Sequence, residues 1–256
     1  MTTSLWREIE YVATTGSTNA DLVARARAGA QEGEVLVAWE QTAGRGRLDR
    51  SWVSPPGASV AMSMLLVPQQ PFERWGWLSL LAGMAVREAL EEIAPRAGRV
   101  QLKWPNDVLI DGRKVCGILS ERVEHPDGAR AVVGLGINIA MNEAELPVDT
   151  ATSLRIAGFP EERREVVAGV LAHFETFYRR WQASGDVREE YRRLCSSVGA
   201  ELRIVVDRGC SIPGIGHDID QHGRIVVATD QGLKSFAVGD VIHARMQEAF
   251  PGEPRA

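Results

Sequence analysis

The stretch that most constrains the fold lies between residues 108 and 139, where three β-rich runs are joined by two short turns. The turns are Asp111-Gly112-Arg113 and Pro126-Asp127-Gly128, and the last run is Ala131–Ile139. Parallel neighbours need a crossover of roughly a dozen residues, whereas antiparallel neighbours need only a tight turn. We therefore expect an antiparallel sheet in this part of the chain.

Segments with helical periodicity surround these strands. Residues 20–28 are rich in alanine, follow Ser17-Thr18-Asn19 and precede Gly29, which is typical of a capped helix with a glycine stop. Apolar residues recur at three- and four-residue spacing in 75–93 and 166–181. Further strands are expected over residues 9–15, 35–38, 60–66 and 100–104. The predicted fold class is α+β, with a mixed, mainly antiparallel sheet flanked by helices.

From about residue 198 the pattern changes to short strands punctuated by glycine and aspartate. The expected strands are 202–206, 212–218, 224–228, 233–236 and 241–245. This spacing is typical of a small β-barrel. With about 150 residues per domain as a guide, 256 residues suit one large and one small unit. We predict a catalytic domain over 1–195 and a barrel over 196–256.

Composition excludes several classes of protein. A net charge of -5 argues against a DNA-binding protein, which normally carries a basic face. The N-terminus has no apolar signal segment, and no apolar run approaches the roughly 18 residues that a membrane span requires. Three cysteines without a CxxC pair indicate neither a disulfide framework nor a zinc site. We expect a cytoplasmic protein that binds neither DNA nor membranes.

The strongest candidate for ligand binding is the loop from Gln41 to Trp52, where Arg45, Arg47 and Arg50 stand among glycines. Arginine offers a planar fork for phosphate or carboxylate, and glycine lets the backbone approach closely, so the loop suits a nucleotide. A solvated surface loop is the alternative. The chain has no GxxxxGKS/T loop, and Asp49 stands where GxGxxG requires its third glycine.

A second candidate is Lys103, which ends an apolar strand just before Trp104-Pro105-Asn106-Asp107. The proline restricts the backbone, so the lysine is held in a fixed place, where it can neutralise charge on a phosphoryl group. The alternative is an ordinary strand-end lysine with its ammonium in water.

Several polar or small residues have both a structural and a functional interpretation. Ser17-Thr18-Asn19 can cap a helix, and can also present amides and hydroxyls to a polar ligand. Gly117 and Asn138 lie in strands where a ligand or another group can approach closely. Trp52 can stack on a purine ring. The five histidines show no metal-ligand spacing, and no GxSxG elbow is present, so neither a metal site nor a hydrolase is predicted.

Five segments occur in an order and spacing that resembles the catalytic core of the biotin–protein ligases. They are GSTN, EQTAGRGRLDRSWVSPPG, KWPNDVL, KVCGILSE and GLGIN. The resemblance runs from about Tyr11 to the end of the chain. It implies a core like that of class II synthetases, followed by an SH3-like barrel. In this family the arginine-glycine loop is disordered until ligand binds and then closes over it.

The resemblance also implies roles for individual residues. Catalysis is expected to use Lys103, Arg45 and Arg47. The residues expected to bind biotin are Ser17, Thr18, Asn19, Gln41, Arg45, Gly46, Arg47, Lys103 and Gly117. The residues expected to bind ATP or the adenylate are Arg47, Arg50, Trp52, Lys103, Asn106 and Asn138.

Two features depart from the family pattern. Asp49 stands where the GRGRxGR loop usually has its last glycine, which affects loop flexibility or retention of the adenylate. Only about ten residues precede the core, so we expect a ligase without the winged helix-turn-helix domain of the repressor-type members.

The resemblance implies a two-step reaction. Biotin attacks the α-phosphate of ATP with the help of Mg²⁺, and the biotinyl-5′-AMP then passes its acyl group to a lysine. The implied partner is the biotin carboxyl carrier protein or domain of a biotin-dependent carboxylase, and a weak or ligand-dependent homodimer is left open. Three alternatives remain: a lipoate or octanoate ligase or transferase of the same fold, a regulator that senses the adenylate, and a non-catalytic binding module.

Overall fold

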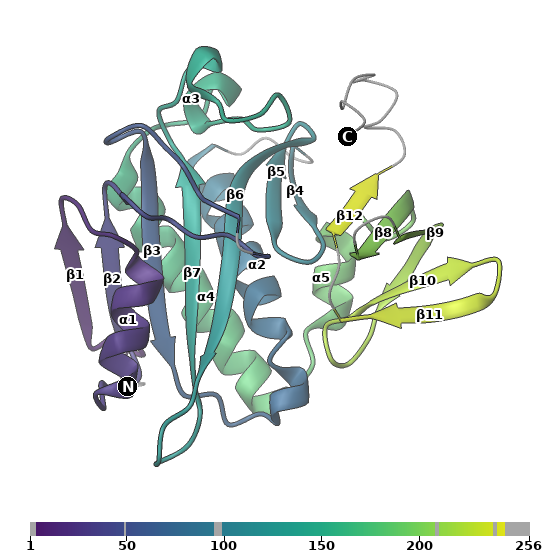
Figure 1. Ribbon diagram of the computed structural model, residues 1–256, viewed down its shortest axis with the longest axis horizontal. Coiled ribbons are helices and arrows are strands. Elements are labelled where there is room, and N and C mark those ends of the chain that lie inside the picture. The colour runs from purple at the N-terminus through teal and green to yellow at the C-terminus, as the bar shows by residue number, and fades with distance from the viewer. Residues whose placement is uncertain (1–3, 49, 95–98, 208–209, 238–239, 244–256) are drawn as a thin grey trace.

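The computed structural model describes residues 4–48, 50–94, 99–207, 210–237 and 240–243. A seven-stranded sheet in the order β1-β2-β3-β7-β6-β5-β4 forms its centre (Figure 1). The strands are β1 (Glu8–Val12), β2 (Glu34–Ala38), β3 (Ser59–Leu66), β4 (Val100–Lys103), β5 (Asp107–Ile110), β6 (Arg113–Val123) and β7 (Arg130–Asn138). Only β1 and β2 pair in parallel, and the other neighbours are antiparallel. The mixed, mainly antiparallel sheet is confirmed.

The two short turns between residues 108 and 139 make hairpins, as predicted, but one hairpin carries an irregularity. In the pairing of β5 with β6, Val108 lies opposite Cys116 while Leu109 lies opposite Lys114. Val115 is therefore an extra residue, as in a β-bulge. A bulge reverses the alternation of side chains along its strand, so Lys114 shares a face with Gly117 rather than with Cys116.

Helices cover both faces of the sheet. Helix α1 (Thr18–Arg27) packs in front of β3 and β7, while α2 (Trp77–Ile93) and α4 (Arg163–Ser184) pack together behind the sheet (Figure 1). The shorter helices are α3 (Leu154–Ala157), α5 (Arg188–Leu194) and the 3₁₀ turns η1 (Phe72–Arg74) and η2 (Glu143–Glu145). Ser17 caps α1 by accepting a hydrogen bond from the amide of Ala20, which confirms the expected cap.

The period-2 pattern of the strands divides their side chains between the two faces. On β7, Val133, Leu135 and Ile137 belong to the large core with α2 and α4. Val132 instead joins the smaller core that packs beneath α1. The next residues on that front face are Gly134, Gly136 and Asn138, which leave space where α1 no longer covers the sheet. A site can therefore form on the front face.

The C-terminal region builds a second, antiparallel sheet in the order β11-β10-β9-β8-β12. Its strands are β8 (Glu201–Asp207), β9 (Cys210–Ile219), β10 (Ile225–Thr229), β11 (Gly232–Phe236) and β12 (Asp240–His243). The indole nitrogen of Trp104 donates to the carbonyl of Gly223 at 2.9 Å, and apolar residues of both sheets share one core. The domain boundary at residue 195 stays a prediction. Among the described helices, none is long and apolar enough to cross a membrane.

Candidate functional site

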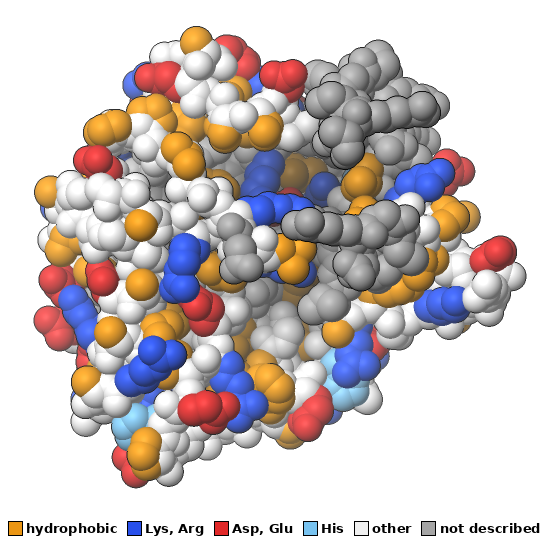
Figure 2. Space-filling view, viewed as in Figure 1, with side chains coloured by type: hydrophobic (Ala, Val, Ile, Leu, Met, Phe, Trp, Pro, Cys, Tyr) orange, Lys and Arg blue, Asp and Glu red, His pale blue; other side chains and the backbone are white. Residues whose placement is uncertain are grey.

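A pocket of about 440 Å³ opens on the front face of the sheet, beside the N-terminus of α1. Its size falls in the usual range for small-molecule sites, roughly 300–1,000 Å³. Strands β6 and β7 supply its floor, and the arginine-glycine loop and residues 147–151 supply its walls. Figure 2 shows lysine and arginine side chains gathered in this hollow.

The arginine-glycine loop folds back on itself as a small hairpin over the pocket. The amide of Gly46 donates to the carbonyl of Arg50 at 2.6 Å, and the amide of Trp52 donates to the carbonyl of Gly44 at 2.9 Å. Asp49, the departure from the family pattern, lies outside the described residues. The hairpin directs the side chains on either side of its tip into the pocket.

Trp52 lies flat against two glycines of the floor. Gly117 on β6 and Gly136 on β7 are directly opposite each other in the pairing. A Cβ at Gly136 would lie 2.5 Å from the indole Cε2 of Trp52, and a Cβ at Gly117 would lie 2.8 Å from Cζ3. Carbon atoms do not approach that closely, so only glycine at both positions admits the indole. Gly117, predicted from the sequence to bind biotin, thus makes room for Trp52.

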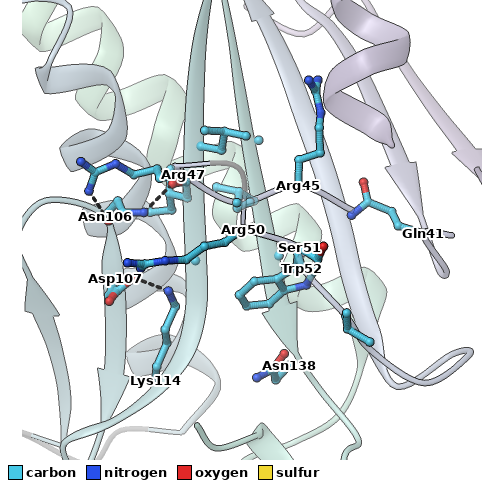
Figure 3. A pocket seen from close by; sticks show the side chains of 18 of the residues that line it. Gln41, Arg45, Arg47, Arg50, Ser51, Trp52, Asn106, Asp107, Lys114 and Asn138 are labelled. Atoms are coloured by element: carbon cyan, nitrogen blue, oxygen red, sulfur yellow. Dashed lines mark hydrogen bonds and ion pairs between the residues drawn. The ribbon is translucent and has the colours of Figure 1, made fainter. Parts of the chain in front are cut away.

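The loop arginines serve opposite ends of the pocket. Figure 3 shows Arg47 directed toward Asn106, to whose Oδ1 its Nη1 donates at 3.2 Å. Arg50 extends toward the same end, near Asp107. Arg45 points away from this group and reaches Glu121, with 3.2 Å between Nη2 and Oε2. Arg47 and Arg50 therefore lie at one end of the pocket, while Arg45 lies at the other end and pairs with Glu121.

Lys114 supplies a further positive charge at the first of these ends. Its Nζ lies 2.5 Å from Oδ1 of Asp107 and 5.7 Å from the centre of a Trp52 ring (Figure 3). The amide of Lys114 donates to the carbonyl of Thr150 at 2.8 Å, which ties the start of β6 to the pocket wall. The bulge at Val115 puts the Lys114 side chain on the pocket face.

Lys103, the lysine favoured from the sequence, has a different position. It ends β4 and does not line the pocket that the described residues form. It lies instead close enough to His243 of β12 to affect that histidine. Burial, with a smaller contribution from the charge of Lys103, lowers the pKa of His243 to about 4. His243 Nε2 is 3.0 Å from the hydroxyl of Ser197, at the junction of the two sheets.

Uncharged polar groups dominate the end of the pocket beside α1. The amide and the hydroxyl of Thr18 both donate to Oε1 of Gln41, at 2.8 and 3.1 Å. These bonds fix the orientation of the Gln41 amide and leave its Nε2 as the donor that a ligand can use. Ser17 and Thr18 line the same end. This end suits a neutral hydrogen-bonding group.

Asn138 and Trp52 offer buried polar atoms that a ligand can satisfy. The Nδ2 of Asn138 donates to the carbonyl of Thr152 at 2.9 Å, so its Oδ1 must face the other way. Within the described part of the chain, Oδ1 of Asn138 and Nε1 of Trp52 are buried without a hydrogen-bond partner. Buried polar atoms are nearly always hydrogen-bonded, so both point to a polar ligand.

Almost all of the residues predicted from the sequence meet in this pocket. Those that line it are Ser17, Thr18, Asn19, Gln41, Arg45, Gly46, Arg47, Arg50, Trp52, Asn106, Gly117 and Asn138. The sequence analysis missed Asp107, Lys114 and the wall at 147–151. Lys114 could have been found from the sequence, because it is the first residue of the segment KVCGILSE, on which the family resemblance rests.

Comparison with known proteins identifies the family. Residues 12–138 match the family model of the biotin/lipoate A/B protein ligases. The chain is 37% identical to the biotin–acetyl-CoA-carboxylase ligase of Mycobacterium tuberculosis, over 94% of this chain and 90% of that one. It is 32% identical to the ligase of the same name from Paracoccus denitrificans, over 90% and 98% of the two chains.

A solved structure agrees in fold over nearly the whole chain. The biotin protein ligase of Aquifex aeolicus, in complex with biotin and ATP, superposes with a TM-score of 0.77 and 28% identity, over 93% of this chain and 99% of that one. The chain therefore belongs to the biotin/lipoate protein ligase family. Within that family it is a biotin protein ligase.

Proposed function

We propose that the pocket activates biotin as biotinyl-5′-AMP and transfers the biotinyl group to a lysine of a biotin carboxyl carrier protein or domain. The difference in charge between the two ends of the pocket is the observation from which we assign residues to biotin and to ATP. The neutral end beside α1 suits the uncharged ureido ring of biotin. The cationic end suits the phosphates of ATP, so the biotin carboxylate and the α-phosphate meet between them.

At the neutral end, hydrogen bonds from fixed donors would hold the ring. Gln41 offers its Nε2, because its Oε1 is already occupied by Thr18. Arg45 lines this end with its charge paired to Glu121, so it can donate from its remaining N–H groups without making the end strongly cationic. The ring would thereby be held with its acid side chain directed toward Lys114.

At the cationic end, Arg47, Arg50 and Lys114 would neutralise the charge on the phosphates. The carboxylate oxygen attacks the α-phosphorus, the bond from that phosphorus to the bridging oxygen breaks, and pyrophosphate leaves. Catalysis of this kind consists mainly of positioning and charge stabilisation. We assign the central cation to Lys114, which lines the pocket, and the sequence-based expectation for Lys103 is tested against it below.

Asn138 would contribute to recognition of the nucleotide. Its free Oδ1 is a hydrogen-bond acceptor, which matches an N–H₂ group of a base rather than a carbonyl. Trp52 would pack against the adenylate from the glycine floor, and Asn106 would hold Arg47 beside the phosphates.

The donor set of the pocket fits a magnesium ion that arrives with ATP. Mg²⁺ in nucleotide sites is usually held by phosphates, water and one or two carboxylates. Asp107 is the single carboxylate among the described residues that line the pocket, and no group of three or more metal-binding side chains is found in the described part of the chain. Asp107 would hold the ion, which would supply neutralisation of phosphate charge.

In the second step the amine of the acceptor lysine attacks the acyl carbon, the bond to AMP breaks, and the nitrogen loses a proton. The mixed anhydride is labile in water, so the hairpin over the pocket would protect it until the acceptor docks.

Pyrophosphate release with biotin, lipoate and octanoate in parallel tests this function. We expect release that depends on biotin and ATP, with incorporation of biotin into a carrier domain that retains its target lysine. A carrier with that lysine changed to arginine is the control. Release with lipoate or octanoate instead of biotin would contradict the assignment.

A further inference from the structure

Glu121 on β6 is a carboxylate that links the arginine-glycine loop to helix α1. Its Oε2 accepts from Nη2 of Arg45 at 3.2 Å and from Nδ2 of Asn19 at 2.7 Å. It lies four residues beyond Gly117 on the same strand, so both face the pocket side of the sheet. One oxygen atom thus joins two segments that are far apart in the sequence.

Asn19 has no hydrogen-bonding capacity to spare for a ligand on its nitrogen. The two hydrogens of its Nδ2 are directed to Glu121 and to the carbonyl of Leu119, and its Oδ1 accepts from the hydroxyl of Ser63 at 2.6 Å. A Cβ on Gly134 would lie 1.8 Å from that Oδ1, so the floor of the sheet also confines the amide. The hydrogen bond from Asn19 therefore fixes the position of the Glu121 carboxylate.

The charge of Glu121 matters because Arg45 stands at the neutral end of the pocket. Without a partner, its guanidinium would attract any anion, including the carboxylate of biotin or a phosphate of ATP. The ion pair is partly exposed, with 48% of the Arg45 side chain and 26% of the Glu121 side chain accessible. A pair of this kind contributes little to overall stability, so its main effect is to orient and neutralise Arg45.

We propose that Glu121 is a positioning residue for the biotin end of the pocket, acting through Arg45; this inference rests on the proposed function. Glu121 holds the guanidinium where it can donate to the uncharged ring, and prevents it from drawing a carboxylate to the wrong end. The pairing of Arg45 with Glu121 thereby contributes to the orientation of biotin in the pocket.

The test compares Glu121→Gln with Glu124→Gln, an identical change at an exposed glutamate just beyond β6 that pairs with Arg122. For Glu121→Gln we expect the Kd for biotin without ATP, and the KM for biotin, to rise about three- to tenfold. We expect the KM for ATP to stay within about twofold, and Glu124→Gln to match the wild type. Equal values for the two variants would overturn the proposal, as would a parallel rise in both KM values.

A double-mutant cycle tests the action through Arg45. If Glu121 acts by holding that guanidinium, Arg45→Gln combined with Glu121→Gln is no worse than Arg45→Gln alone, within about twofold. If the double variant instead shows the product of the two single effects on the Kd and KM for biotin, Glu121 does not act through Arg45. Thermal unfolding checks that each variant folds. If Glu121→Gln does not fold, Glu121→Asp replaces it, because aspartate keeps the charge but moves it away from Arg45. We expect the Kd and KM for biotin to rise in Glu121→Asp as well, by a smaller factor. Wild-type protein that binds biotin but releases no pyrophosphate would contradict the proposed reaction and leave the Kd comparison valid.

Discussion

Exchange of Lys114 for methionine is expected to reduce adenylation by about two orders of magnitude. Methionine keeps the length of the side chain and removes the charge. A unit charge about 4 Å from a phosphoryl oxygen is worth about 4 kcal/mol at an effective dielectric constant of about 20. Solvent screens part of this attraction, because 34% of the Lys114 side chain is exposed. About 3 kcal/mol of transition-state stabilisation remains, which corresponds to a factor of about 10² in kcat.

The matched comparison is Lys103→Met, the same exchange at the lysine that the sequence favoured. Because Lys103 is outside the pocket of the described residues, we expect its variant to keep kcat within about threefold. The assay is biotin-dependent pyrophosphate release in a single turnover, with titration of biotin binding to confirm an intact neutral end. Loss of activity in Lys103→Met together with an active Lys114→Met would refute our reasoning and restore the expectation from the sequence.

Three further outcomes are expected. Gly136→Ala should displace Trp52, since its Cβ would lie 2.5 Å from the indole, and should raise the KM for ATP at least tenfold. Gly16→Ala, whose Cβ would have no neighbour within 4 Å, is the control in a melting assay of folding. Because the pKa of His243 is lowered to about 4 from an ordinary 6.5, the unfolded chain binds more protons between these values, and stability falls as pH drops through this window. Urea unfolding gives the free energy of unfolding at pH 7 and at pH 5. With screening allowed for, the decrease between the two pH values should be about 1–2 kcal/mol smaller in His243→Gln than in the wild type. An equal decrease in both proteins would contradict the assignment of this pH dependence to His243. Removal of Mg²⁺ with EDTA should stop pyrophosphate release but leave calorimetric binding of biotin intact, and magnesium should restore it; release that persists in EDTA contradicts the assignment of Asp107.

Local patterns were sufficient to predict most of the elements. The turns at Asp111-Gly112 and Pro126-Asp127-Gly128 are too short for a crossover, so antiparallel pairing of β5, β6 and β7 followed directly. The polar residues before the alanine-rich segment predicted α1, and Ser17 does cap it. Each of these features depends on residues that are neighbours in the chain, which is why the sequence alone reveals them.

The composition of the pocket was also largely readable from the sequence, because the family motifs name its residues. The role of each residue in the pocket could not be read from the sequence. Gly117 looked like a ligand contact, yet its missing side chain accommodates Trp52, which comes from a different part of the chain. Asn19 was predicted to bind biotin as well; it lines the pocket, and its amide is hydrogen-bonded to Leu119, Ser63 and Glu121. Such partners meet only when the sheet and α1 have packed together.

The two lysines show the limit of the sequence most clearly. Simple alternation along β6 puts Lys114 on the same face as the buried Cys116, whereas the end of β4 before Pro105 looked like a fixed place for the cation at Lys103. The extra residue at Val115 reverses the alternation and turns Lys114 into the pocket. The sequence by itself determined the sheet, its helices and nearly all of the residues of the site. Only the tertiary structure decided which lysine lies in the pocket, because a bulge depends on how two strands pair and leaves no mark in the local pattern of either strand.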